Sequence, residues 1–543
     1  MEDRGPKQPF LRRHRWITWM AAALLVAIAA AGIAVSVAVR RAEPFLRVLI
    51  VDQLAQRFHA RVELDSFHFS ISNGLWAEGK GLRIWPPAEA AGMAVSAGIG
   101  APRPLIALAE FRFHAPLRYV PGKPISIDRI ELRGLDIDMP PGSHFTHQPG
   151  EPGASKPAAT GPLRFEIGSM TCAGAELTLE TSKPGKLPLT FAIQTLNVTH
   201  IDEGGRMNFD AVLSIPKPKG LLSTHGALGP WESQDPGSTP VSGSYRLANA
   251  DLSVFKGVAG TLSSTGGYLG TLRELVVDGE TDTPNFSLTH FGAAEALHTG
   301  FHAFVDGTSG DTRLEPVHAT LGQSKFVASG QVARVAAVDD AGVLRPVGHK
   351  IDLDVRVDAG RIEDFLRLTS RGGDPLLTGA LQLQTTLDLP PGHDSVEHRL
   401  NLKGRFELSG ARFSNAKVQQ RIAELSLRGQ GKANELKSTP AEDVRSTMKS
   451  DFTLAGGVLQ LPALVYMVPG AEIDLQGAYA LEAGTLDFDG AANLQATVSQ
   501  IVGGWKGKLL KPADSFFKKG GAGTRIGVHI SGTREDPHFG VDL

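Results

Sequence analysis

Apolar and polar residues alternate with a period of two along most of the chain after residue 60. The clearest runs are Ile351 to Val357, Leu381 to Leu389, Leu400 to Leu408, Ile473 to Leu481 and Leu486 to Val498. Strict alternation gives a strand one apolar and one solvated face, which is typical of antiparallel sheets. Pro-Gly pairs between the runs supply turns. The chain is therefore predicted to be mostly β.

The apolar face of so many strands must be covered, and the sequence offers few helices to cover it. Helical spacing is confined to short stretches: Arg361 to Leu368, Asn415 to Leu427 and Val498 to Leu510. Two arrangements satisfy the pattern, either two sheets packed face to face or one long sheet curled over its own apolar face. The pattern alone leaves both open, and closed sandwich cores are the commoner solution.

One segment near the N-terminus has a different pattern. Trp16 to Val39 is an uncharged run of 24 residues rich in Ala, Val, Ile and Leu. As a helix it reaches about 36 Å, enough to cross a hydrocarbon core of about 30 Å. A cleavable signal peptide is the alternative, but its apolar part is about 7–15 residues long. The length favours a retained transmembrane helix that begins at Trp16 and ends at Val39.

Basic residues indicate how this helix is oriented. Five of them lie in residues 1–15 and two follow the span, at Arg40 and Arg41. Because positive charge is retained on the cytoplasmic side, residues 1–15 are predicted to be a cytoplasmic tail. Most of the chain then lies outside the cytoplasm. A second, amphipathic helix from Glu43 to Phe58 is expected either to lie on the membrane surface or to cap the sheet.

Composition excludes several classes of function. The net charge of -2 provides no general basic surface, so no nucleic-acid partner is expected. The single cysteine, Cys172, excludes an intrachain disulfide framework and a cysteine metal cluster. Phosphate-loop and nucleophile-elbow signatures are absent from the sequence. His298 and His302 are four residues apart in a segment that reads as strand, where such a pair is too far apart to share a metal. No catalytic residue, cofactor or metal site is predicted, and the protein is not expected to be an enzyme.

Two further segments interrupt the strand pattern. Pro140 to Pro162 holds six prolines and four glycines and is predicted to be an extended loop. A basic and aromatic segment could contact an anionic membrane surface or lipid headgroups, or could instead plug the end of the sheet. Its candidate contact residues are Trp505, Lys506, Lys508, Lys511, Phe516, Phe517, Lys518 and Lys519.

Several segments in order along the chain resemble the AsmA family of bacterial envelope proteins. The resemblance begins with the anchor and residues 44–70 (PFLRVLIVDQLAQRFHARVELDSFHFS) and covers most of the chain beyond residue 160. Further segments that carry it are VVDGETDTPNFSL (276–288), FVDGTSGDTRLEPVHATL (304–321), SNAKVQQRIAELSLRGQG (414–431), GAYALEAGTLDFDG (477–490), LLKPADSFFKKGGAGTRI (509–526) and SGTREDPHFGVDL (531–543). None of these is a catalytic signature, and their specificity comes from number and order.

The resemblance implies a protein anchored in the inner membrane, with the bulk of the chain periplasmic, built as an elongated, curled antiparallel β-sheet with few short helices. It implies five parts: residues 1–15, the cytoplasmic tail; 16–39, the transmembrane helix; 40–139, an N-terminal AsmA-like helix and strands; 140–162, the Pro/Gly-rich loop; and 163–543, an AsmA-like β-groove with its C-terminal region. About 25 to 30 strands at a spacing of about 4.8 Å are expected.

The expected function is transfer of phospholipid between membranes in outer-membrane biogenesis, with acyl chains shielded in the apolar groove. The candidate lining residues are Ile351, Leu353, Val355, Val357, Leu381, Leu383, Leu400, Leu402, Phe406, Leu408, Ile473, Leu475, Leu486 and Phe488. Expected partners are phospholipid, the inner membrane, and outer-membrane or envelope proteins. The alternative is a non-catalytic scaffold that assembles outer-membrane components through its sheet edges.

Overall fold

The structure is a computed structural model, and it describes most of residues 43–542. Besides residues 1–42 and isolated positions, the stretches left out are 56–59, 72–73, 86–102, 117–124, 140–164, 202–205, 233–235, 289–292, 369–374, 436–443, 503–510 and 512–522. The transmembrane prediction for Trp16 to Val39 and the loop prediction for Pro140 to Pro162 therefore lie outside the described residues. In the part of the chain that is described, no helix is long and apolar enough to cross a membrane.

The chain divides into two compact units. The smaller unit comprises residues 1–138, 147–177 and 195–204, and the larger one comprises 139–146, 178–194 and 205–543. Three strands contribute to both units: β6 (Phe165–Leu179), β7 (Leu189–Ile201) and, by its last residue Met139 alone, β5 (Ile125–Met139).

The smaller unit is an antiparallel arrangement of strands. It contains β1 (Arg61–Glu63), β2 (Ser66–Ile71), β3 (Leu75–Trp85), β4 (Ile106–Ala115) and β5 (Ile125–Met139). Strands β1 and β2 both pair with β3, which pairs with β4, and β4 pairs with β5. The ring of Phe111 lies so close to Gly79 that a Cβ there would be 2.3 Å from it, so a glycine is required for this packing. Described residues from Glu43 to Ala55 are helical, as predicted for that segment.

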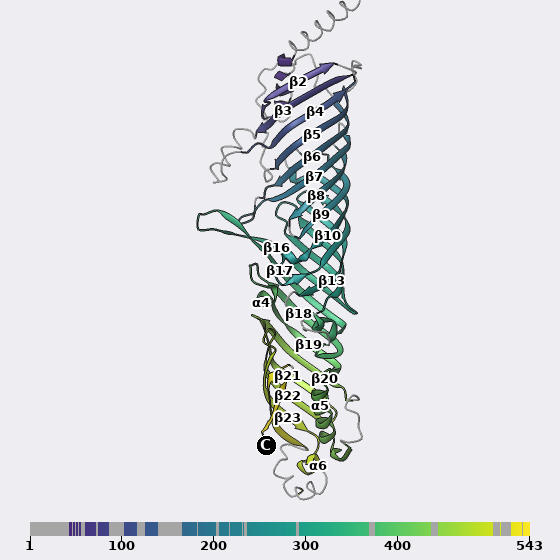
Figure 1. Cartoon of the computed structure of the whole chain (residues 1–543), viewed down its shortest axis with the longest axis vertical. Helices are drawn as coiled ribbons and strands as arrows, with labels where there is room; N and C mark the ends of the chain where they lie inside the picture. Colours follow the sequence, from purple (N-terminus) through teal and green to yellow (C-terminus); the bar gives the residue numbers. More distant parts are fainter. Residues whose placement is uncertain are drawn as a thin grey trace, which may run out of the picture. The chain divides into compact units, whose positions relative to one another are not determined.

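The larger unit is a long antiparallel meander that curls into an open half-barrel (Figure 1). Each strand from β8 onward pairs with the next, except that the short β11 pairs with β13 and β10 pairs with β12. The strands are β8 (Met207–Pro216), β9 (Lys219–Leu228), β10 (Pro240–Asp251), β11 (Val258–Ala259), β12 (Thr261–Thr271), β13 (Glu274–Leu288), β14 (Glu295–Asp306), β15 (Thr312–Leu321), β16 (Ser324–Val338), β17 (Leu344–Arg361), β18 (Leu377–Leu389), β19 (Asn401–Phe413), β20 (Ser446–Ala455), β21 (Val458–Val468), β22 (Ala471–Ala480), β23 (Thr485–Leu494), β24 (Thr524–Thr533) and β25 (Pro537–Asp542).

Helices in the larger unit are few and short. The α-helices are α3 (Ile362–Arg367), α4 (Val396–Arg399), α5 (Ala416–Gly429) and α6 (Val498–Val502), and single 3-10 turns lie at η2 (Pro236–Ser238), η3 (Leu252–Val254) and η4 (Ala433–Glu435). Helix α5 begins where its sequence predicts, because the side chain of Asn415 accepts hydrogen bonds from the N–H groups of Lys417 and Val418. The predicted helices near residues 361 and 415 are thus confirmed.

The predicted β class and the curled sheet are confirmed in the described residues, and twenty-five strands lie within them. The face-to-face sandwich that the alternation also allowed is not the arrangement of the larger unit. One prediction extends too far. The alternating run from Leu486 to Val498 ends as a strand at Leu494, because the chain turns there and Val498 begins α6.

Candidate functional site

A row of register partners, most of them apolar, runs across the strands of the larger unit on one face of its sheet. Each residue of the row is the register partner of the next from β8 to β23, so these residues lie side by side along the hydrogen-bonding direction. The row consists of Phe209, Gly226, Gly243, Tyr268, Val277, Ala303, Leu314, Gly330, Leu353, Leu387, Leu402, Leu454, Leu459, Tyr479 and Leu486. We call the face that carries this row the apolar face.

The neighbouring register row, on the opposite face, is much more polar. It includes Leu269, Val276, Phe304, Arg313, Gln331, Asp352 and Asp388. Arg313 stacks over the Phe304 ring with its guanidinium carbon 4.2 Å from the ring centroid, and the Gln331 amide donates to Asp352. Leu269 is 67% exposed on this side. The sheet therefore has one hydrocarbon-rich face and one solvated face, as the alternation predicts.

Register places the sequence-predicted lining residues on the apolar face, with one exception. Leu353 and its alternating neighbours on β17 share this face, as do the predicted residues of β18, β19, β22 and β23 that pair into it. The exception is Leu400. It forms the C-cap of α4 and donates its N–H to the Val396 carbonyl, so it lies outside strand β19 although its spacing is in phase.

Burial divides the apolar face into two stretches. From Phe209 to Leu387 the row residues are partly buried, apart from Ala303, which is 1% exposed. Between β8 and β16 the described chain contains no helix longer than a single 3-10 turn. Among the described residues, strands, turns and loops therefore provide their partial shelter there, and no long helix does. We call this the open stretch.

The second stretch, from β19 to β24, is covered. Its side chains alternate between buried and exposed, with Met448, Phe452, Leu464, Ile473 and Leu475 all at 9% exposure or less. The buried cluster also includes Leu377 and Leu381 of β18. The side chains that pack against the whole cluster from helices are Ile362, Phe365 and Leu366 of α3, which lies at the β18 end, Ile422 and Leu425 of α5, and Ile501 of α6.

Helix α5 is fixed on the covered stretch by polar contacts as well as by packing. The Ser426 hydroxyl donates to the Pro469 carbonyl at 2.8 Å, and the Gln419 amide donates to the Val444 carbonyl at 2.8 Å. A Cβ on Gly429 would be 2.4 Å from the Gly470 carbonyl oxygen. The helix thus approaches the β21–β22 turn too closely for any side chain at residue 429.

Glycines and aromatic rings interlock on the β9–β14 part of the open stretch. A Cβ on Gly266 or Gly279 would be 2.8 Å or 2.5 Å from the Tyr245 side chain, and one on Gly243 would be 2.6 Å from the Tyr268 hydroxyl. The Tyr245 hydroxyl lies 3.1 Å from the Ser264 hydroxyl, and the Tyr268 hydroxyl lies 2.7 Å from that of Thr224. Burial raises the pKa of both tyrosines. This arrangement is not predicted from the sequence, because register across four strands decides it.

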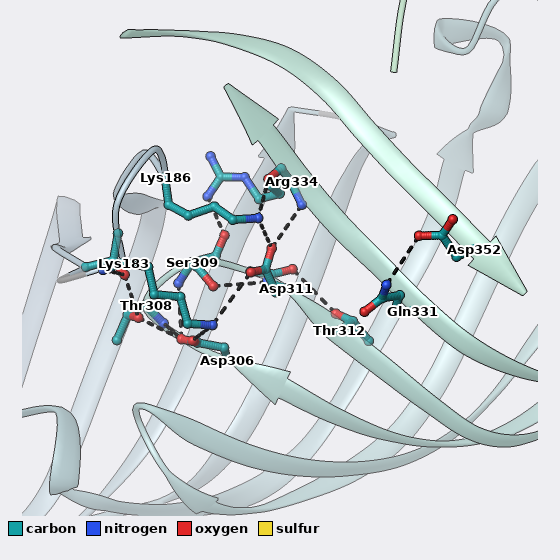
Figure 2. A network of polar contacts seen from close by, with 12 residues as sticks. Lys183, Lys186, Asp306, Thr308, Ser309, Asp311, Thr312, Gln331, Arg334 and Asp352 are labelled. Atoms are coloured by element: carbon teal, nitrogen blue, oxygen red, sulfur yellow. Dashed lines mark hydrogen bonds and ion pairs between the residues drawn. The ribbon is translucent and has the colours of Figure 1, made fainter. Parts of the chain in front are cut away.

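A cluster of charged side chains, also missed, joins the β6–β7 turn to the β14–β15 turn (Figure 2). Lys183 pairs with Asp306 at 2.6 Å and with Asp311 at 3.6 Å, and Lys186 pairs with Asp311 at 2.8 Å. Arg334 of β16 donates its backbone N–H to Asp311 at 3.0 Å and its guanidinium to the Ser309 carbonyl at 3.0 Å. We call these five residues the ionic bridge.

Hydrogen bonding sets the charge state of the ionic bridge. Burial alone would raise the pKa of Asp306, but hydrogen bonds from Lys183 and Thr308 and from the backbone of the turn lower it to about 2. The pKa of Asp311 is lowered in the same way against burial, chiefly by Lys186. The hydrogen bond to Asp306 raises the pKa of Lys183. Both carboxylates are therefore ionised and Lys183 is charged at neutral pH.

The basic and aromatic segment predicted to contact membrane or headgroups falls almost entirely outside the described residues. Only Lys511 of its eight candidate residues is described, and its side chain is exposed. The alternatives that the sequence left open for this segment, a membrane contact or a plug, both stay predictions.

Histidines of the solvated face pair with carboxylates. His298 and His302 lie in strand β14, as their sequence context indicated, and each is 2.7 Å from an aspartate of β13, Asp282 and Asp278 respectively. Among the described residues, one group could bring three ligand atoms within 4.8 Å of one another: Asp487, Asp489 and His529. All three are exposed, and Nδ1 of His529 is hydrogen-bonded to a carboxylate oxygen of Asp489 at 2.6 Å. This is ordinary surface pairing.

Comparisons with protein-family models, with curated proteins and with solved structures each found no match to this chain.

Proposed function

We propose that the protein shelters hydrocarbon chains on the open stretch of its apolar face and so carries phospholipid between membranes of the bacterial envelope. The observation that supports this most is the apolar row itself. It continues from β8 to β18 without a described helix or second sheet on top of it, apart from α3 at the end of β16 and β18. A large uncovered apolar surface is uncommon in proteins that bind nothing on it.

The chemistry of the open stretch suits acyl chains. Each methylene moved from water into apolar surroundings gains about 0.8 kcal/mol, so even partial shielding of two chains lowers the cost of leaving a bilayer. Between β14 and β18 the row consists of Ala303, Leu314, Gly330, Leu353 and Leu387, whose side chains offer no hydrogen bonds. Such a surface binds chains without fixing them at one position.

The resemblance to the AsmA family supports the cellular setting. On this proposal the segment Trp16 to Val39 anchors the protein in the inner membrane, and the sheet acts in the periplasm during outer-membrane biogenesis. No catalysis, cofactor or metal is part of the proposal.

The test compares two substitutions of the same kind on opposite faces. Leu353→Asp places a carboxylate in the open stretch, whereas Leu269→Asp places one on the solvated face. Purified full-length protein is assayed for transfer of fluorescent phospholipid between liposomes, and for phospholipid that co-purifies. We expect Leu353→Asp to slow transfer at least about tenfold, because an acyl chain must then pass a charge that needs water, and we expect Leu269→Asp to transfer at the wild-type rate.

Two results would count against lipid transfer. One is a wild-type protein that neither carries phospholipid nor moves it between liposomes. The other is equal transfer by both variants. In the first case a scaffold becomes the better proposal, for which the structure offers an edge: β25 pairs with β24 and with no other described strand.

A further inference from the structure

Two contacts join opposite edges of the curled sheet in the larger unit. The first involves the turn between β10 and β12 and the loop between β18 and β19. The Val396 N–H donates to the Lys256 carbonyl at 3.1 Å, and Gly257, with a φ of +99°, lies against the Glu397 carboxylate. Successive paired strands alternate in direction, and β18 comes seven strands after β10 when β11 is left out. An odd number of steps places these two turns at opposite edges.

The ionic bridge repeats this arrangement with charged groups. It joins the β6–β7 turn to the β14–β15 turn, and β14 again comes seven strands after β6 when β11 is left out. The two contacts thus have the same offset, and each starts four strands from the other along its edge. Both lie where a half-barrel would otherwise be open.

The β16–β17 hairpin occupies the interval between the two contacts on one of these edges. Its residues Ala333 to Val338 and Leu344 to Lys350 extend beyond the register of β15 and β18 and pair with each other. Figure 1 shows this hairpin projecting away from the sheet instead of crossing to the other edge. Val338 and Val343 near its tip are 66% and 44% exposed. Among the described residues, the opening is therefore bridged at the β14–β15 turn and at the β18–β19 loop, and the hairpin between them projects away from it.

A bridge across the opening would obstruct the headgroup of a phospholipid but not a hydrocarbon chain that lies beneath it. Acyl chains can lie on the apolar face beneath the bridge, but the charged headgroup needs water and must lie in the opening. A headgroup that moves along the opening meets the ionic bridge, which stands in its way. This reasoning rests on the function proposed above.

The ionic bridge is built from groups that can separate. Its side chains are only partly buried, at 47% exposure for Lys183, 21% for Lys186, 18% for Asp306 and 23% for Asp311. Partly exposed ion pairs are individually weak and are screened by salt. The cluster also has three cations for two carboxylates, so a phosphate group has cations available to it as it displaces an aspartate. The contact at Lys256 and Val396 uses backbone groups and lacks these properties.

We propose that the ionic bridge is a gate across the opening of the half-barrel, which must separate for a phospholipid headgroup to pass. The gate is closed by Lys183 and Lys186 on one edge and by Asp306 and Asp311 on the other. Arg334, at the base of the projecting hairpin, holds the aspartate side in place and also contacts the β6–β7 turn, because its guanidinium donates to the Pro188 carbonyl at 3.4 Å and its own carbonyl accepts from Lys186.

A disulfide across the bridge tests this directly. The hydroxyls of Thr181 and Thr308 lie 3.3 Å apart across it, so cysteines at these two positions would place their sulfur atoms close to each other. The full-length Thr181→Cys/Thr308→Cys protein is assayed for phospholipid transfer between liposomes before and after reduction. Native Cys172 is buried, and burial raises the pKa of its thiol, so it competes poorly for the disulfide.

The gate predicts that the oxidised protein transfers at least about tenfold more slowly than the reduced one, while the amount of bound phospholipid is unchanged. The single variant Thr181→Cys should show no effect of reduction. If the oxidised protein transfers as fast as the reduced one, the bridge is not a gate. If the wild-type protein transfers nothing, the proposed function fails and the gate fails with it. A wild-type protein that transfers phospholipid, together with an oxidised variant that is equally fast, rejects the gate alone.

A second variant weakens the gate in the opposite direction. Lys183→Met removes one partner of the bridge, and because a partly exposed pair is weak we expect transfer to rise roughly two- to fivefold. Lys350→Met is the matched control, since Lys350 is 45% exposed, pairs with Asp352 and Asp388 on the solvated face and is not one of the five residues of the ionic bridge. Equal rates for the two variants and the wild type, or slower transfer by Lys183→Met with an unchanged melting temperature, would overturn the gate.

Discussion

The burial of the covered stretch predicts that Leu475→Asp strongly destabilises this part of the sheet. Leu475 is 8% exposed on β22, where register pairs it with Leu464 on one side and with Gly490 on the other. It belongs to the cluster against which Ile422 and Leu425 of α5 pack. An aspartate here would lie among hydrocarbon side chains with helix α5 on top of it.

Two contributions set the size of the effect. Losing the burial of one leucine side chain costs about 1.5–3 kcal/mol, and placing a carboxyl group where it has no partner costs about 2 kcal/mol or more, even when it takes up a proton. The sum is about 3.5–5 kcal/mol or more, which is comparable with the whole free energy of unfolding of many domains. We therefore expect Leu475→Asp to unfold β21–β23 and release α5.

Hydrogen–deuterium exchange of the full-length protein is the appropriate measurement, because it reports on β21–β23 separately from the rest of the sheet. Leu269→Asp is the control, since an exposed site on the solvated face should change stability by less than about 0.5 kcal/mol. If the backbone amides of β21–β23 are equally protected from exchange in both variants, the helices do not bury this face. The division into open and covered stretches is then wrong.

Two further predictions concern the ionic bridge and a strand glycine. The folded pKa of Asp306, about 2, lies below its ordinary value of 3.8; its contribution to stability is therefore fully present above pH 3.8 and is lost as the pH falls towards 2. Thermal unfolding is measured between pH 5 and pH 2 for the wild type and for Asp306→Asn. The wild type should lose about 1 kcal/mol of unfolding free energy from this group, after solvent screening, and the variant should not. The same dependence of stability on pH in both proteins would contradict the prediction. A Cβ on Gly477 would lie 2.1 Å from the Asp487 carbonyl oxygen, whereas Gly300 has nothing within 4 Å. Gly477→Ala should therefore lower the unfolding free energy by about 1–3 kcal/mol and Gly300→Ala should not, and equal midpoints in urea would refute the argument.

The sequence predicts strands well where one face is apolar, because burial on one side forces a period of two. On β17 the alternation of Ile351, Leu353, Val355 and Val357 with charged residues is enough to assign both the strand and its two faces. Leu400 shows the limit of this reasoning. Its spacing matches that of Leu402, but the loop before β19 forms α4 and removes Leu400 from the strand.

Contacts that depend on the curl could not be predicted from spacing. Lys186 and Asp311 are 125 residues apart and meet only because seven successive strands twist and curl by a particular total amount. No local sequence pattern determines the total twist and curl of seven strands. The same holds for Tyr245, whose ring requires glycines on two other strands at matching register. Helix α5 was predicted as a helix, yet only the folded sheet shows that its apolar side lies on β19–β23.

The division of the apolar face also constrains how a lipid could leave it. A hydrocarbon chain moving towards the C-terminus from β8 reaches the β19–β24 stretch, where α5 already occupies the face and Leu464 and Ile473 are buried. Continuing along that face would require displacing α5 together with its hydrogen bonds to Pro469 and Val444. Sideways movement through the opening requires no such change. Since the contact at Val396 closes the opening beside β18, the interval next to the β16–β17 hairpin is the exit that the arrangement favours. On this argument, deleting the hairpin tip should alter release of lipid from the protein and leave its uptake unchanged.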